Sequence, residues 1–159
     1  MSIANKVSEY LDKNHIKYQL LQHKPSKNSL SSAIQAHIKT SQLVKAIMLE
    51  DLQGGKLMAI LPASHKISLN ALNSHFNRQF RLMKESHIYE IFEDCKHGAV
   101  PPLAQAYEID RVYDEFLMQQ DNLYLEAGDH ISLIQLSQEG FKKLMQYSVP
   151  LKFSYRLFN

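Results

Sequence analysis

Apolar residues recur at helical spacing in several parts of the chain. Ile3, Val7, Tyr10 and Leu11 fall on one face of a helix, which predicts an amphipathic helix over residues 3–13. Serine is a favoured residue at the start of a helix, because its hydroxyl accepts a hydrogen bond from a free backbone N–H. Serines therefore predict four further helices: one from Ser29 or Ser31 to about Ile38, one after Ser68, one from Ser86 to Phe92 and one after Ser137.

Other apolar stretches have the composition of β-strands. The segments 43–50 and 56–62 are joined by the turn-forming sequence DLQGG, which predicts a β-hairpin. No linker or repeat divides the chain, so we expect a single mixed α/β domain over residues 1–159. Shorter strands are expected near 18–21, 111–114, 122–126 and 131–136, with an irregular segment over 94–108.

A lysine interrupts the first strand of this hairpin. In LVKAIML, residues 43–49, side chains alternate between two faces, and both faces are apolar apart from Lys45. Burying an unpaired ammonium group is costly, so a lysine in such a strand needs an anion or an opening to solvent. Two interpretations remain: Lys45 prevents aggregation on an edge strand, or it lies at the mouth of a pocket and binds an anion.

Two consecutive prolines stiffen the loop HGAVPPLAQAY, residues 97–107. The prolines fix φ and donate no hydrogen bond, while Gly98 accepts backbone angles that other residues avoid. The N–H groups of Gly98, Ala99 and Val100 would then be held in place, as the stabilisation of an oxyanion requires. The alternative is a rigid connection between a helix and a strand.

The sequence Gly128-Asp129-His130 lies between two predicted strands. Glycine and aspartate are frequent in turns, so a structural turn is the favoured interpretation. As a binding site, Asp129 and His130 could instead hold a water molecule or a ribose hydroxyl.

Cys95 precedes the proline loop, with His97 two residues further on. A neighbouring histidine can activate a thiolate, but a lone cysteine is more often structural, so we disfavour a covalent nucleophile. The eight histidines form no HExxH motif and there is no CxxC pair, so we expect no metal site.

Composition narrows the compartment and the partners. The 159 residues are 45% hydrophobic, enough for a core, and a single cysteine excludes an internal disulfide and fits a reducing compartment. The N-terminal segment is charged throughout, and no run approaches the roughly 18 apolar residues of a membrane span. We therefore expect a cytoplasmic protein without a membrane partner. A net charge of +2 permits contact with a few phosphates and gives no reason to expect binding to DNA.

Taken in order, several stretches resemble the YbaK/prolyl-tRNA synthetase-associated editing-domain family. They are SSAIQA, LVKAIML, MAILPASHKISLNAL, GAVPPLAQAY, VYDEFL and NLYLEAGDHISLIQLS. A strand lysine followed by a glycine–proline loop at this distance is the most characteristic part of the match. The likeness covers a core of about residues 5–147, whereas the tail, 148–159, has no counterpart.

The resemblance implies a single domain with a mixed, partly barrel-like β-sheet surrounded by helices. It also implies a freestanding aminoacyl-tRNA deacylase, which hydrolyses the ester of a mischarged tRNA in trans and needs no cofactor. Prolyl-tRNA carrying a wrong small amino acid is the first candidate substrate. The expected partner is the acceptor CCA end of an aminoacyl-tRNA, and an aminoacyl-tRNA synthetase is a second candidate. The alternative is a non-catalytic module that binds the acceptor end or a synthetase.

Residue by residue, the resemblance places the family's strand lysine at Lys45 and its GxxxP loop at Gly98–Pro102. The residues expected to take part in catalysis are Lys45, Gly98, Ala99, Val100 and Pro102. The residues expected to bind substrate are Ser31, Ser32, Gly128, Asp129 and His130.

Overall fold

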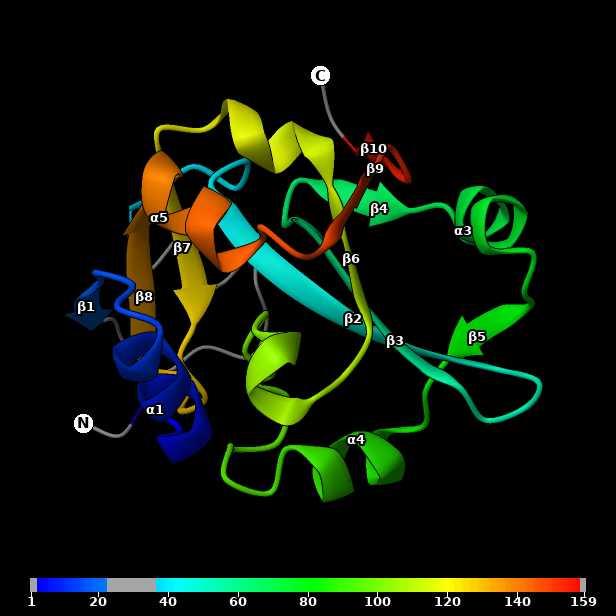
Figure 1. The fold of residues 1–159 in the computed structure, drawn as a ribbon, viewed down its shortest axis with the longest axis horizontal. Helices are drawn as coiled ribbons and strands as arrows, with labels where there is room; N and C mark the ends of the chain where they lie inside the picture. The colour runs from blue at the N-terminus through cyan, green and yellow to red at the C-terminus, as the bar shows by residue number, and fades with distance from the viewer. Residues whose placement is uncertain (1–2, 23–36, 158–159) are drawn as a thin grey trace.

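The computed structural model of the protein describes residues 3–22 and 37–157 (Figure 1). Ser31 and Ser32 lie outside these residues, as does most of the helix expected to begin at Ser29 or Ser31. Only the last two residues of that helix, His37 and Ile38, are described, and they are not helical.

Four α-helices are described, and the sequence predicted each of them. Ser68 caps its helix by accepting a hydrogen bond from the N–H of Ala71 at 3.3 Å, and Ser137 accepts one from Gly140 at 3.1 Å. The prediction for Ser86 is wrong, because that helix begins one residue earlier and Lys84, its N-cap, makes no capping bond. None of the described helices has the length and hydropathy needed to cross a membrane. The bounds are α1 Asn5–Lys13, α3 Leu69–Phe76, α4 Glu85–Ile91 and α5 Gln138–Leu144, with 3₁₀-helices η1 Ala104–Tyr107 and η2 Glu115–Gln119.

Eight strands form one mixed sheet in the order β1-β8-β7-β2-β3-β6-β9, with β5 also paired to β2. The predicted hairpin is confirmed: β2 and β3 are antiparallel, in register from Val44–Pro62 to Glu50–Lys56. Among the described strands the path runs from β1 to β9 without closing into a barrel. The bounds are β1 Gln19–Gln22, β2 Leu43–Asp51, β3 Lys56–Pro62, β5 Phe80–Leu82, β6 Arg111–Asp114, β7 Asn122–Glu126, β8 Ser132–Ser137 and β9 Val149–Leu151.

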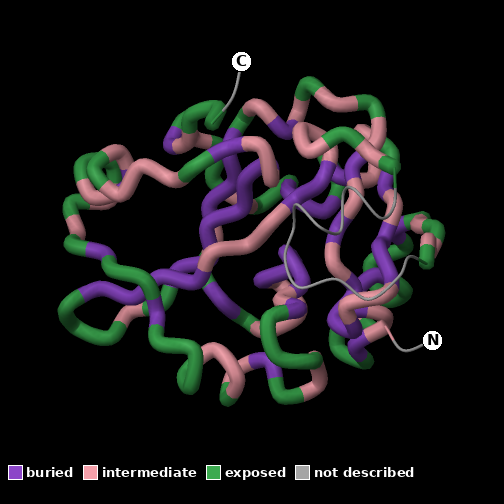
Figure 2. Tube along the Cα trace, turned by 180° about the vertical axis from the view of Figure 1, so that it is seen from behind, coloured by how far each residue is buried: buried purple, intermediate pink, exposed green. Residues whose placement is uncertain are grey.

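The two faces of β2 and β3 pack into different hydrophobic clusters. Met58 and Ile60 face the larger cluster, which includes residues of α1 and α5. Leu57, Ala59 and Leu61 face a second cluster. Burial on both faces explains why both strands read as nearly continuous apolar runs. Figure 2 shows the buried residues along the crossing strands and the exposed residues in the surrounding loops.

The sheet forks along one edge of β2. On this edge β7 pairs with Leu43 and Val44, whereas β5 pairs with residues 49–51. Between these two contacts, no described strand pairs with this edge of β2 at Lys45–Ile47. These three residues are half-buried. β2 lies in the middle of the sheet order, so the interpretation of Lys45 as an edge-strand lysine is wrong. The lysine instead lies beside a gap between β7 and β5 that none of the described strands fills.

The tail, 148–159, contributes two strands that the sequence pattern did not predict. β9 adds to the sheet parallel to β6, and β10, Ser154–Arg156, pairs with β4, His65–Ile67, in a separate two-stranded sheet. Between β9 and β10, Phe153 is only 1% exposed. The tail is therefore part of the packed structure.

Candidate functional site

Lys45 is a half-buried cation in apolar surroundings. It shares a face of the sheet with Leu43 on its own strand and with Leu61, its partner on β3. Its ammonium group makes no hydrogen bond or ion pair with any residue that the structure describes. Burial lowers the pKa of Lys45 from its ordinary value, because an ammonium group loses solvation there. A ligand whose oxygen atoms accept hydrogen bonds from the ammonium group would replace the solvation that this group loses on burial.

Glu126, at the end of β7, was not selected from the sequence. Tyr124 lies opposite Leu43, so Glu126, two residues later, leaves β7 on the face that carries Lys45. Its Oε2 accepts hydrogen bonds from the N–H groups of Ala127 at 2.7 Å and Gly128 at 3.2 Å. Burial raises the pKa of this carboxyl group above its ordinary value. Its signal in the sequence is the acidic residue that ends the strand NLYLE.

The Gly128–His130 turn is held by its aspartate. Oδ1 of Asp129 accepts hydrogen bonds from the N–H groups of Ile131 at 3.0 Å and Ser132 at 2.7 Å. Its Oδ2 accepts a third bond, from the hydroxyl of Ser132 at 2.8 Å. Gly128 has φ +111°, and a Cβ there would come within 3.1 Å of the Cys95 sulfur. These contacts support the structural interpretation of Gly128 and Asp129.

His130 connects this turn to the proline loop. Its Nε2 donates a hydrogen bond to the carbonyl oxygen of His97 at 2.6 Å, since a carbonyl can only accept. Its Nδ1 lies 3.8 Å from Oε1 of Glu126. Its backbone is left-handed, with φ +66°. The hydrogen bond from Nε2 ties the turn to the loop, which suits a residue that positions the loop.

The loop begins at Gly98, whose φ of +85° favours glycine. The N–H of Ala99 donates to the carbonyl oxygen of Lys96 at 3.0 Å. This bond differs from the expectation that the Ala99 N–H faces a substrate, because that donor is already used. No described backbone acceptor receives the N–H of Gly98 or Val100, so these two donors remain candidates. Pro102 is buried and fixes the far end of the loop.

Cys95 lies beside the loop but is a poor nucleophile. Its sulfur is 3.3 Å from the hydroxyl of Tyr107 and 3.5 Å from Oδ1 of Asp94. Burial raises the pKa of the thiol to about 12, so the thiol remains protonated near neutral pH. This geometry agrees with a structural cysteine.

On the other side of Lys45, His65 was also missed by the sequence analysis. Oδ2 of Asp114 accepts a hydrogen bond from the Ser154 hydroxyl at 2.6 Å. Because that hydroxyl donates its hydrogen to Asp114, Nδ1 of His65, 2.8 Å away, donates to the hydroxyl oxygen. Nε2 of His65 is buried and has no partner among the described residues. Burial lowers the pKa of His65, and the positive charges of Arg156 and Lys45 lower it further, against the opposing effect of Asp114.

The structure therefore brings together part of the expected site. The loop at Gly98, the turn at His130 and the carboxylate of Glu126 form one contact network. Lys45 is on the neighbouring strand, at the gap beside β7. Ser31 and Ser32 lie outside the described residues, so their expected role stays a prediction.

Comparison with known proteins places this geometry in context. The family model for the aminoacyl-tRNA editing domain matches residues 23–144. No curated protein matches the sequence.

Among solved structures, the hypothetical protein APE2540 superposes with a TM-score of 0.84 at 22% identity, over 95% of this chain and 100% of the other. A candidate trans-editing enzyme for prolyl-tRNA synthetase superposes with a TM-score of 0.82 at 14% identity, over 98% of each chain. A candidate signal transduction protein from Marinobacter aquaeolei VT8 has a TM-score of 0.76 at 22% identity, over 94% of this chain and 30% of its own. At these identities the likeness concerns the fold.

Proposed function

This chain belongs to the aminoacyl-tRNA editing domain family, and on that premise we propose that it hydrolyses the ester of mischarged aminoacyl-tRNA in trans. The observation that carries the proposal is Lys45, a half-buried cation beside a gap in an apolar sheet. The 3′ end of a tRNA has phosphate and ribose oxygens that can bind such a cation. A charge-assisted hydrogen bond to one of them would hold the terminal adenosine in place.

The reaction needs positioning and stabilisation of charge. A water oxygen attacks the ester carbonyl carbon, the bond from that carbon to the ribose oxygen breaks, and the ribose oxygen takes up a proton. We assign the N–H groups of Gly98 and Val100 to the oxyanion that forms on the carbonyl oxygen. The neighbouring ribose hydroxyl or a bound water can carry the proton. Pro102, Ala99 and the Gly128–His130 turn would hold the loop in position.

For the substrate, we propose tRNAᴾʳᵒ that carries a wrong small amino acid. Synthetase pockets reject smaller or isosteric amino acids poorly, so a separate hydrolytic site is needed to remove them. The similar structure described as a candidate trans-editing enzyme for prolyl-tRNA synthetase supports this choice of tRNA.

The proposal is tested by deacylation of a panel of mischarged tRNAs, with alanyl- and cysteinyl-tRNAᴾʳᵒ first and correctly charged prolyl-tRNA as the substrate to be spared. We expect turnover by the wild type and clearly reduced turnover in Lys45→Met. The matched control is Lys56→Met, an exposed lysine on the neighbouring strand. Tight binding of the acceptor end without turnover across the whole panel would favour a non-catalytic binding module instead.

A further inference from the structure

The small net charge of the chain hides a strong separation of charge along the sequence. Residues 52–84 contain five lysines or arginines, and residues 140–159 contain four. Neither segment contains an aspartate or a glutamate. These two segments therefore carry +9, whereas the whole chain carries +2.

The fold joins these two basic segments side by side. β4 belongs to the first segment and β10 to the second, and they pair in antiparallel register. Lys66 lies opposite Tyr155, so both side chains leave the same face of this two-stranded sheet. Lys66, Lys152 and Arg156 are exposed, and Tyr155 is 52% exposed. We call Lys66, Lys152, Tyr155 and Arg156 the β4–β10 surface.

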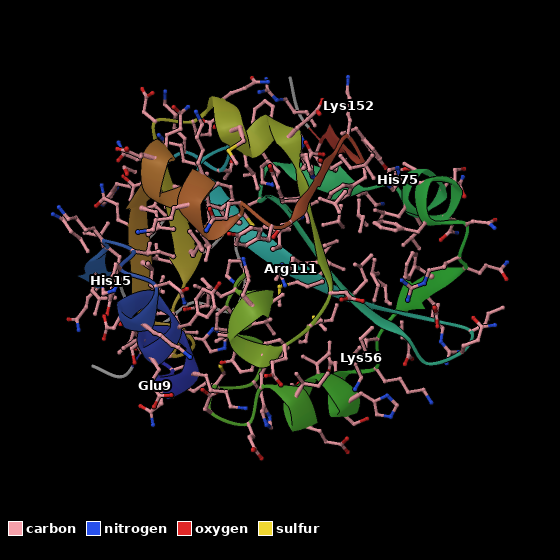
Figure 3. All side chains as sticks on the ribbon, viewed as in Figure 1. Glu9, His15, Lys56, His75, Arg111 and Lys152 are labelled. Carbon is pink, nitrogen blue, oxygen red and sulfur yellow. The ribbon has the colours of Figure 1, made fainter. Side chains whose placement is uncertain are left out.

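Acidic residues do little to neutralise this surface. Asp114 is only 2% exposed, and its carboxylate accepts bonds from Phe116, Phe153 and Ser154. Glu115, beside Phe116, is an exposed acid at the border. Figure 3 shows Lys152 and His75 at the same end of the molecule, away from Glu9 on α1. Lys66 and Tyr155 therefore leave one face of the strand pair, whereas Arg156, opposite His65, leaves the other face and lies 5.7 Å from the centre of the Phe116 ring. The buried carboxylate of Asp114 beside this pair is already occupied.

Backbone hydrogen bonds join the β4–β10 strand pair to the strand that carries Lys45. The N–H of Ala63 donates to the carbonyl oxygen of Leu43 at 2.7 Å, and the N–H of Leu157 donates to Ser64 at 3.0 Å. These bonds connect the start of β2, through the link between β3 and β4, to the end of β10. His65, the first residue of β4, lies opposite Arg156 in the same strand pair.

We propose that the β4–β10 surface binds the phosphate backbone of the tRNA next to its acceptor end. This inference rests on the proposed function, which places the terminal adenosine at Lys45. Lysine and arginine neutralise phosphates and release their counterions, and an exposed tyrosine offers a face on which an unpaired base can stack. The surface then gives most of the affinity for tRNA, while the site at Lys45 and Gly98 acts on the ester.

The test uses two doubly substituted proteins with the same change of charge. Lys66→Glu/Lys152→Glu alters the β4–β10 surface, and Lys13→Glu/Lys17→Glu alters exposed lysines in and just after α1. Affinity for uncharged tRNAᴾʳᵒ is measured by fluorescence anisotropy at several salt concentrations. Hydrolysis is measured with mischarged tRNAᴾʳᵒ and with alanyl-adenosine, which lacks the phosphate backbone.

We expect the surface variant to bind tRNA about tenfold or more weakly at low salt, with a salt slope that is shallower by roughly 0.7–0.9 for each lost phosphate contact. The control should change affinity much less. Hydrolysis of alanyl-adenosine should be the same in the surface variant and the wild type, since that substrate does not reach the β4–β10 surface.

Two results would overturn the inference: equal loss of tRNA affinity in the two variants, or wild-type affinity in the surface variant. If the wild type deacylates tRNA in either case, the proposed function stands without this surface. Conversely, a wild type that binds tRNA through the β4–β10 surface but hydrolyses neither substrate would refute the proposed enzyme and retain the surface. A wild type that neither binds nor hydrolyses tRNA would refute both.

Discussion

His130 stands directly over Gly98. The ring donates to the carbonyl oxygen of His97, and a Cβ placed on Gly98 would be 3.4 Å from the Cε1 atom of that ring. The left-handed backbone of Gly98, with φ +85°, aims the following N–H groups, while the ring limits how far the loop can shift. The geometry of the loop therefore depends on having glycine, which lacks a Cβ atom, at position 98.

Gly98→Ala is expected to lower deacylation strongly, because the added methyl group strains the left-handed backbone that aims the loop N–H groups and also contacts the ring of His130. The matched control is Gly54→Ala, in the hairpin loop, where φ is +83° but no atom lies within 4 Å of the new Cβ. Each substitution should cost about 1–2 kcal/mol of folding free energy for the left-handed conformation. Steady-state kinetics and urea unfolding of the two variants separate the effects. Similar kinetics in both variants would show that the loop geometry does not matter for the reaction.

Lys45→Met should reduce kcat/KM by roughly 5- to 150-fold, which corresponds to the loss of about 1–3 kcal/mol from a bond to a charged group. The free energy of unfolding of this variant should stay the same or increase, which means equal or greater stability. Burial disfavours the ammonium group, and methionine fills a similar volume. Thermal unfolding and kinetics are measured on the same preparation. A variant that is less stable and fully active would assign Lys45 to the fold instead of the site.

His65 should make the stability of the protein depend on pH. Its pKa is lowered in the folded state, so as pH falls the unfolded chain takes up a proton at this residue before the folded chain does. The stability contributed by the neutral ring is present above the unfolded value of about 6.5, and it is lost as pH falls toward the folded pKa. Urea unfolding between about pH 8 and pH 5 should show a smaller loss in His65→Gln than in the wild type.

For this pH experiment the control is His75→Gln, an exposed histidine on α3, which should keep the wild-type dependence on pH. Other titrating groups remain in all three proteins, so the differences between their curves report on the substituted residue. Parallel curves for His65→Gln and the wild type would exclude a role for His65.

Cys95→Ser is expected to retain deacylation, because the proposed reaction uses water and the thiol has a pKa of about 12. Iodoacetamide should label the native protein slowly at neutral pH for the same reason. Mass spectrometry can look for an acyl-enzyme during turnover. A trapped acyl group on Cys95, together with an inactive Cys95→Ser variant, would show that the nucleophile is the thiol of Cys95 and not water.

The long elements of the fold could be predicted because their own sequences carry a periodic signal. The β2–β3 hairpin follows from two apolar runs joined by a turn, and the Ser68 and Ser137 caps precede helical patterns. β4 and β5 have three residues each, which is too short for any periodicity. β9 and β10 depend on partners about forty or more residues away, so their own sequence does not reveal them.

The candidate site was predictable only in part, for a related reason. Lys45 stands out because it interrupts a strand that is otherwise apolar on both faces. Glu126 and His65 gain their properties from burial and from distant partners, which a local pattern cannot show. The net charge of +2 is an average over the chain, so it conceals basic segments that meet only after folding.

The position of β9 and β10 at the end of the chain also has a consequence during synthesis. Oδ2 of Asp114 receives hydrogen bonds from residues 39 and 40 positions further along, so this oxygen lacks its native partners until that part of the chain has been made. Until residues 149–156 leave the ribosome, β6 has an open edge and β4 has no partner strand. Such edges can pair with other nascent chains, so translation that stalls before the tail should yield a product prone to aggregation.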